Sequence, residues 1–163
     1  MVLFGGNTSY APQSYLRDTW TFTPGARGTY ATYGTGCPGS GGTPSLGSRL
    51  GEVPIAGQTF HAQVTGLPLV GPAYLFVGAS RTQWGLVSLP FDLSSIGMQG
   101  CTLLASGDFL FPVTTVLGSG LCSFDVPLSL AGQSFYNQVI AFDPAANPTG
   151  LTVSNGAEAF VGN

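Results

Sequence analysis

The stretch "QTFHAQVTG" (residues 58–66) carries the pattern that decides the fold. Phe60, Ala62 and Val64 would point to one face of an extended chain, and the polar residues between them, including His61 and Gln63, to the other. Strict alternation of this kind predicts a half-buried antiparallel strand.

Similar strand patterns continue to the end of the chain, separated by turns rich in Gly and Pro. The segments that read as strands are 73–78, 84–93, 100–106, 108–117, 121–130, 133–143, 151–156 and 157–162. Gly107 signals a tight hairpin or a bulge, and Asn155-Gly156 signals a hairpin turn. About seven to nine strands, roughly ten residues apart and without any helical period, predict an all-β fold. We expect a two-sheet antiparallel β-sandwich of jelly-roll or immunoglobulin-like type.

Three regions are expected along the chain. Residues 58–163 would form the sandwich, and residues 1–22 a separate hairpin. Residues 23–57 are rich in Gly, Pro and Ser and read as a linker, with short strand-like pieces at 29–33 and 45–49.

Charge is scarce in this sequence, since only 7% of its residues are charged against roughly 25% in ordinary soluble domains. The chain has no Lys and a formal net charge of −3, which excludes electrostatic binding to nucleic acid as a function class. A content of 44% hydrophobic residues argues against disorder. No apolar run approaches the roughly 18 residues of a membrane span, and no cleavable signal peptide is visible.

The three cysteines, Cys37, Cys101 and Cys122, stand too far apart for a zinc or redox motif. They read as small buried hydrophobic residues, with room for one disulfide and one remaining thiol.

Residues 1–22 resemble the end of a kelch repeat. The matching positions are Phe4-Gly5-Gly6 and, after a variable loop, Tyr15, Leu16 and Asp18-Thr19-Trp20. The resemblance implies a strand pair with a tight glycine turn, and we expect Trp20 to be buried by the packing of this hairpin. A single repeat cannot form a propeller, which needs four or more blades.

Residues 33–163 resemble a β-rich module found at the C-terminal end of long exported proteins in planctomycete-like bacteria. The matching stretches are "YGTGCPGSGGTPSL", "PIAGQTF", "LFVGAS", "LPFDLSSIGMQGCTLLAS" and "FYNQVIAFDPAANPTGLTVSNG". The resemblance implies export, a β-sandwich, and a disulfide between Cys37 and Cys101 that leaves Cys122 free. Met1 would then be an internal residue of a longer reading frame or the start of an expressed fragment.

Catalytic chemistry has few candidates. His61 is the single histidine, and a hydrolase of esterase type would use it as a general base. Ser80 and Ser119 are candidate nucleophiles, and Asp92, Asp108 or Asp125 could orient the base. We favour a surface histidine, because the chain has no nucleophile-elbow motif. The seven acidic residues are scattered, which neither supports nor excludes a glycosidase pair.

Aromatic side chains are the stronger indication of binding. Trp84 and Tyr74, with Arg81 nearby, could form a platform for sugar rings or polymer chains, because aromatic faces stack on apolar C–H surfaces. Other aromatic residues that could join such a platform are Tyr30, Tyr33, Tyr136 and Phe111. The alternative is ordinary core packing. Asp143 and Asn147 in "DPAAN" could contribute to a calcium site, but an Asx turn is favoured there.

Low charge and strand edges without Lys favour self-association, in which the N-terminal hairpin could take part. We therefore expect a non-catalytic, extracytoplasmic structural, adhesive or self-assembly module, secreted or on the cell surface, with no cofactor and no metal. A carbohydrate- or polymer-binding module is the first alternative, and a small hydrolase using His61 is the second.

Overall fold

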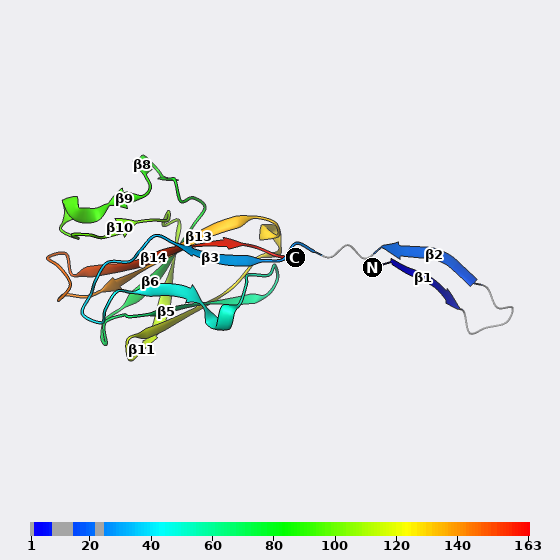
Figure 1. Ribbon diagram of the computed structural model, residues 1–163, viewed down its shortest axis with the longest axis horizontal. Coiled ribbons are helices and arrows are strands. Elements are labelled where there is room, and N and C mark those ends of the chain that lie inside the picture. The colour runs from blue at the N-terminus through cyan, green and yellow to red at the C-terminus, as the bar shows by residue number, and fades with distance from the viewer. Residues whose placement is uncertain (1, 8–14, 22–24) are drawn as a thin grey trace.

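The computed structural model describes residues 2–7, 15–21 and 25–163, with side chains from residue 25 onward (Figure 1). It contains 49% strand and 7% helix, and its sheets are antiparallel. The all-β prediction is therefore confirmed. The expected burial of Trp20 and the kelch-type packing of Phe4 concern side chains outside the described residues.

The elements follow in the order of the chain. The first strands are β1 (Val2–Asn7), β2 (Tyr15–Thr21), β3 (Thr29–Tyr33), β4 (Ser45–Ser48), β5 (Thr59–Thr65), β6 (Ala73–Gly78) and β7 (Gln83–Trp84). The later strands are β8 (Val87–Ser88), β9 (Phe91–Asp92), β10 (Thr102–Leu103), β11 (Phe109–Val116), β12 (Ser119–Asp125), β13 (Ser134–Phe142) and β14 (Leu151–Phe160). Three short 3-10 helices are η1 (Arg49–Gly51), η2 (Leu93–Ile96) and η3 (Leu128–Leu130).

Eight strands form one sheet in the order β3-β14-β13-β6-β11-β12-β5-β4. β1 and β2 pair with each other in antiparallel orientation. The two outermost strands of the eight, β3 and β4, come from the segment 23–57 that was expected to be a linker with short strand-like pieces. The sheet therefore begins at Thr29 rather than at residue 58.

The eight-stranded sheet curls around a single interior. The sheet changes direction at β11. Residues 109–113 of this strand pair with β6, and residues 114–116 pair with β12. Curling brings the two outermost strands, β3 and β4, next to each other and β4 next to β14. The alternation predicted for residues 58–65 is present, since Phe60, Ala62 and Val64 are buried in this interior.

The interior is packed with aliphatic and aromatic side chains. Leu46, Leu75, Val64, Val139 and Phe60 are among its most deeply buried members. Phe124 stacks on Phe111 with 5.4 Å between ring centroids and meets Phe135 edge to face at 5.9 Å.

A second, smaller core lies on the outer face of the sheet. The segment that follows β6 passes over β13 and β14 (Figure 1) and buries Leu89, Leu93, Met98 and Leu103 there. The disulfide between Cys37 and Cys101 belongs to this cluster. The covering segment is thus linked covalently to the β3–β4 loop and held against the sheet by apolar packing.

The strand expected over 84–93 is interrupted. This segment contains only the short strands β7, β8 and β9. Gly85 has a φ of 58°, which turns the chain directly after β7. Asp92 then accepts a hydrogen bond from the Ser94 amide and caps η2.

Neither the tight hairpin nor the bulge expected at Gly107 is formed. β10 pairs with β9 in the covering segment, whereas β11 pairs with β6 and β12 in the main sheet. Each flanking strand therefore has a partner elsewhere in the fold. The hairpin that does form joins β11 to β12 through Leu117 and Gly118, both at positive φ.

Asn155-Gly156 is not a turn. Both residues lie inside the continuous strand β14, which carries one extra residue opposite Val139 of β13. This β-bulge is satisfied by the Ser154 hydroxyl, which accepts the Val139 amide at 2.9 Å. The Asn155 side chain is buried and hydrogen-bonded to β4, so tertiary pairing overrides the local turn preference.

Candidate functional site

The outer face of β5, β12 and β11 carries the polar residues that alternate with the core. His61 lies directly across from Ser123, and Gln63 lies across from Leu121. Their in-sequence neighbours on β5, Phe60 and Ala62, are buried. The period of two in the sequence thus places these polar groups together on one surface.

A shallow groove of about 620 Å³ follows this surface. Its lining residues are Arg49, Gln63, Pro112, Thr114, Val116, Ser119, Gly120, Leu121 and Ser123. Hydroxyl, amide and guanidinium groups are therefore mixed with small apolar surfaces along one open channel. Such a mixture can hydrogen-bond the hydroxyls of a ligand and pack against its C–H faces.

His61 is held by a carboxylate beside this groove. Its Nδ1 lies 2.8 Å from Oε2 of Glu52, which follows η1, and both side chains remain partly exposed. The pair fixes the orientation of the imidazole and leaves Nε2 free. Ser123 is the cross-strand neighbour of His61, so a carboxylate, an imidazole and a hydroxyl occupy adjacent positions on the sheet.

This arrangement differs from a serine-hydrolase triad in one respect. The His61 hydrogen bond recorded among residues 25–163 is to Glu52, and Ser123 is not hydrogen-bonded to the imidazole. Nucleophilic catalysis requires the hydroxyl within hydrogen-bond reach of its base. The geometry therefore suits a hydrogen-bonding surface for a ligand better than an activated nucleophile.

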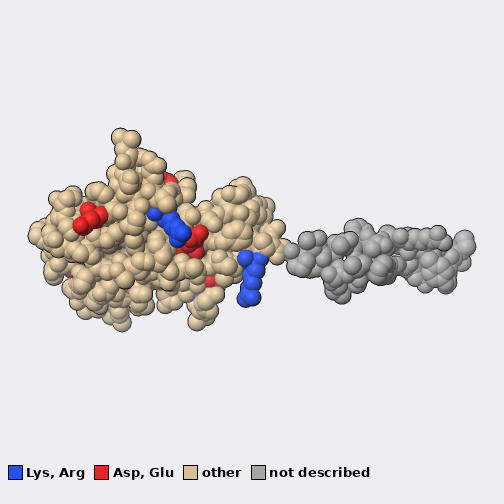
Figure 2. All heavy atoms as spheres, turned by 45° about the horizontal axis from the view of Figure 1, so that its top comes forward, with Lys and Arg blue, Asp and Glu red and all other residues tan. Residues whose placement is uncertain are grey.

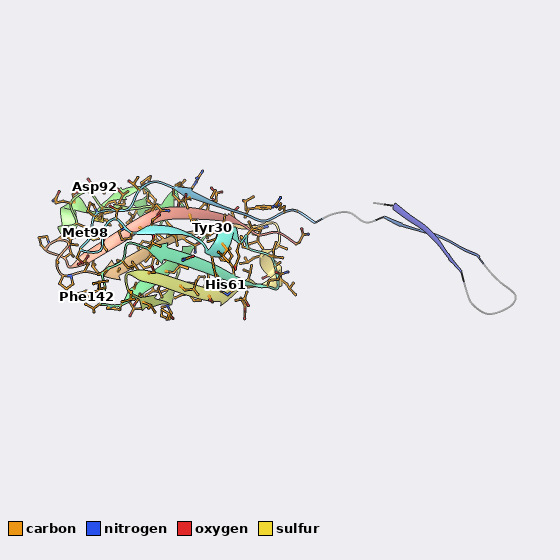
Figure 3. All side chains as sticks on the ribbon, turned by 60° about the horizontal axis from the view of Figure 1, so that its bottom comes forward. Tyr30, His61, Asp92, Met98 and Phe142 are labelled. Carbon is orange, nitrogen blue, oxygen red and sulfur yellow. A yellow bond between two sulfur atoms is a disulfide. The ribbon has the colours of Figure 1, made fainter. Side chains whose placement is uncertain are left out.

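The other predicted catalytic residues are dispersed over the fold. The Ser80 hydroxyl accepts the amides of Thr82 and Gln83 in a turn, and Ser119 begins β12 at the far end of the groove. His61 and Asp92 lie far apart in the molecule (Figure 3). Hydrogen bonds from Ser94 lower the pKa of the fully exposed Asp92. None of these residues is brought to His61.

Asp108 and Asp125, the remaining candidates to orient the base, form local contacts. Asp108 accepts the Ala79 amide and the Ser106 hydroxyl at 2.8 and 3.0 Å. Asp125 accepts the Thr59 hydroxyl at 2.6 Å. Both carboxylates line a second pocket that is separate from the groove.

The residues of the expected aromatic platform differ in exposure and in contacts. Trp84 and Tyr74 are both exposed, and Trp84 rests 6.4 Å from the ring of Phe76. Arg81 pairs with Glu158 at 3.1 Å and lies over the ring of Tyr33, another platform candidate, at 5.4 Å. The other platform candidates, Tyr30, Tyr33, Tyr136 and Phe111, are partly buried.

Burial strongly perturbs two tyrosines. Desolvation raises the pKa of Tyr33 to about 12, although the nearby Arg81 lowers it. Desolvation, with a further contribution from Cys122, raises the pKa of Tyr30 still more. Tyr33 donates to the Leu104 carbonyl at 2.8 Å, whereas the buried Tyr30 hydroxyl has no hydrogen-bond partner among the described residues.

The disulfide implied by the resemblance, Cys37–Cys101, is present and Cys122 is a buried free thiol. Burial raises the pKa of the Cys122 thiol. Asp143 is buried and accepts the Ser40 and Ala145 amides, the second in an Asx turn. Within residues 25–163, no cluster of three or more His, Cys, Asp or Glu side chains is arranged to hold a metal ion.

Glu52, Ser123 and Arg49 were not singled out from the sequence. Ser123 becomes a neighbour of His61 only through the β5–β12 register, and Arg49 reaches the groove through η1. Parity along "LCSFDV" would have placed Ser123 on an outer face, but it could not have named the strand opposite.

The chain matches no protein-family model, and neither the curated proteins nor the solved structures contain a match to it. None of the helices that the structure describes is long and apolar enough to cross a membrane.

Proposed function

We propose that this chain is a non-catalytic structural, adhesive or self-assembly module that works outside the cytoplasm. We class its curled sheet as a two-sheet sandwich that shares β11, at the end of an exported protein of the planctomycete-like type, with a kelch-like hairpin before it. The disulfide supports an oxidising location, because such bonds persist outside the cytosol.

The observation that carries this proposal is an apolar tip at one end of the sheet. Leu69 and Val70 in the β5–β6 loop and Val116 and Leu117 at the β11–β12 turn are 66% to 85% exposed. The two loops adjoin, because the Leu67 amide donates to the Gly118 carbonyl at 2.9 Å. We name these four side chains the apolar tip.

Such a surface is costly to leave in water. Burying a fully exposed Leu or Val contributes roughly 1.5–3 kcal/mol, and contiguous exposed apolar surface usually marks an interaction site. Charged side chains, which oppose unspecific contact, are sparse on the face shown in Figure 2. The tip is therefore the surface by which this module would contact a second copy or another apolar surface.

The test is the oligomeric state of the full chain by size-exclusion chromatography with light scattering. Leu117→Asn removes one tip side chain at a φ of 48° that Asn tolerates. We expect it to weaken association by about tenfold or more, as loss of one buried Leu would. Leu50→Asn is the matched control, because Leu50 is 93% exposed at a φ of 52° but lies outside the tip.

Association that both variants weaken equally, or a full chain that stays monomeric at high concentration, would contradict self-assembly through the tip. A chain lacking residues 1–25 separates a contribution of the N-terminal hairpin from that of the tip.

The groove beside His61 favours a second candidate function, which is binding of a carbohydrate or other polyhydroxylated polymer. Its lining combines Gln63, Ser123 and Arg49 with small apolar side chains. Binding to a glycan panel should be lost on Gln63→Ala and kept on Gln133→Ala, since Gln133 is exposed and does not line the groove. Activity on esters that His61→Ala abolishes would instead support the hydrolase alternative.

A further inference from the structure

The strands β11 and β12 are paired with each other over only part of their length. They pair only through Thr114–Val116 and Ser119–Leu121, next to their hairpin turn. Beyond these residues β11 stays with β6 and β12 stays with β5. The two halves of the sheet therefore open away from each other between Phe109–Val113 and Cys122–Asp125.

Pro112 lies in the part of β11 that does not pair with β12, and its backbone is suited to that position. In the two-residue hairpin, Val116 and Ser119 form the pair next to the turn, and main-chain groups alternate in direction along a strand. The main chain of Pro112 therefore points towards β12, where no strand accepts it. Because Pro has no N–H, no ladder hydrogen bond is lost at this position.

The opening contains an apolar pocket of about 330 Å³, within the size range of small-molecule sites. Its walls are mainly aromatic and aliphatic: Val77, Phe109, Phe111, Phe124, Val126, Pro127, Leu130 and Phe135. Phe124 and Phe111 stack with ring planes 23° apart at the centre of this set. Phe109 is 67% exposed, so its ring is free to close over a ligand.

Two carboxylates complete the lining, Asp108 directly before β11 and Asp125 at the end of β12. Asp108 uses Oδ2 for both of its hydrogen bonds, to the Ala79 amide and the Ser106 hydroxyl. Asp125 uses Oδ1 for the Thr59 hydroxyl. One oxygen of each carboxylate thus remains available, and the lining contains no Lys, Arg or His.

We propose that this pocket binds an organic cation, an ammonium group carried on an aromatic or alkyl body. The body would pack between Phe109, Phe111 and Phe124, whose rings also attract a cation through their faces. The ammonium would donate to the free oxygens of Asp108 and Asp125 at the pocket's polar side. An anionic ligand would meet two like charges, and a polyhydroxylated one would leave most of its hydroxyls against aromatic walls.

The proposed cation pocket is separate from the apolar tip and from the groove beside His61. The pocket shares no lining residue with the groove. A result that contradicts self-assembly would therefore not contradict cation binding. A result that contradicts cation binding would likewise not contradict self-assembly.

The test uses the full chain and three probes of similar shape: benzylamine, benzyl alcohol and benzoate. Amide chemical shifts in an NMR titration report both affinity and location. We expect saturable binding of benzylamine at millimolar concentration, with shifts centred on Phe109, Phe124 and Val126. Benzyl alcohol should bind at least about fivefold more weakly, and benzoate more weakly still.

Matched variants separate charge from packing. Asp108→Asn with Asp125→Asn keeps hydrogen-bond acceptors but removes both charges, and it should weaken benzylamine binding by about fivefold or more. Asp92→Asn, which removes an exposed charge outside the pocket, should leave it unchanged. Phe109→Ala should weaken the binding, whereas Phe91→Ala, at another exposed ring, should not.

The same spectra show whether each variant remains folded. Equal affinity for benzylamine and benzyl alcohol would overturn the proposal. So would undiminished benzylamine binding in the folded double variant, or shifts that map away from the β11–β12 opening.

Discussion

Asn155 of β14 hydrogen-bonds both main-chain groups of Leu46 on β4. Its Oδ1 accepts the Leu46 amide at 2.8 Å, and its Nδ2 donates to the Leu46 carbonyl at 3.1 Å. The buried Asn155 side-chain amide thus forms the two main-chain hydrogen bonds that a neighbouring strand would form, and it links β14 to the outermost strand β4. The curled sheet is held together at this point by one residue that the β-bulge turns towards β4.

Asn155→Ala should therefore be strongly destabilising. It leaves the Leu46 amide and carbonyl without their partner, and each buried unsatisfied group costs about 1–3 kcal/mol. We expect urea unfolding to show a loss of about 2–4 kcal/mol. Gln133→Ala, at an exposed side chain, should change stability by less than about 0.5 kcal/mol. An equally small effect for Asn155→Ala would mean that the contact with Leu46 does not hold the sheet closed.

Gly156 is required because the Tyr33 ring lies against it. A Cβ at Gly156 would come within 2.6 Å of Tyr33 Cζ, whereas a Cβ at Gly47 would meet nothing within 4 Å. Gly156→Ala should cost about 1–3 kcal/mol through overpacking. Gly47→Ala should leave stability unchanged or raise it by up to about 1 kcal/mol, because Ala restricts the unfolded chain. Thermal unfolding of both variants measures the difference, and equal midpoints would refute the assigned role of Gly156.

The Cys37–Cys101 disulfide joins residues with a sequence separation of 64 and links the covering segment to the β3–β4 loop. Removing it by Cys37→Ala with Cys101→Ala should lower stability by about 2–4 kcal/mol. The measurement is best made alongside Cys122→Ala, which removes the buried thiol and with it any thiol exchange.

Native Cys122 should resist alkylation until the chain is unfolded, since it is buried and its pKa is raised. Rapid labelling of native protein would contradict this burial.

Stability should fall at alkaline pH in part because of Tyr33. Its pKa is about 12 in the folded chain against an ordinary value of 10.0, so the folded state keeps the proton that the unfolded state releases. The contribution is complete below about pH 10 and is lost as pH rises towards 12. Tyr33→Phe should reduce this alkaline loss and cost about 1 kcal/mol at neutral pH through the missing bond to Leu104.

The measurement is denaturant unfolding as a function of pH, with phenolate absorbance followed in parallel. Tyr74→Phe, at an exposed tyrosine, is the control. An alkaline profile that is the same in Tyr33→Phe and in the unchanged chain would assign the loss to other groups.

Several features of the fold could be read from the sequence because they depend on local periodicity. Alternation around Phe60, Ala62 and Val64 placed a strand correctly and showed which face is buried. The apolar run at 73–78 became β6, between β13 and β11 in the sheet. The disulfide came from a resemblance rather than from spacing.

The candidate sites could not be read in the same way, because they depend on pairing between distant strands. His61 acquires Ser123 as a neighbour through register, and Glu52 through the turn at η1. The pocket with Asp108 and Asp125 exists because β11 changes partner midway, which no local pattern encodes.

By itself, then, the sequence determined the all-β class, the sparse charge and the positions of the main strands, since period-two alternation and turn residues act over a few neighbours. Tertiary structure decided the rest. It drew Asn155-Gly156 into β14, where burying the amide against Leu46 outweighs the turn preference of the dipeptide. It also placed residues 29–33 and 45–48 at the two ends of a sheet whose curling brings them together, because long-range hydrogen bonds and burial there exceed what local propensity can specify.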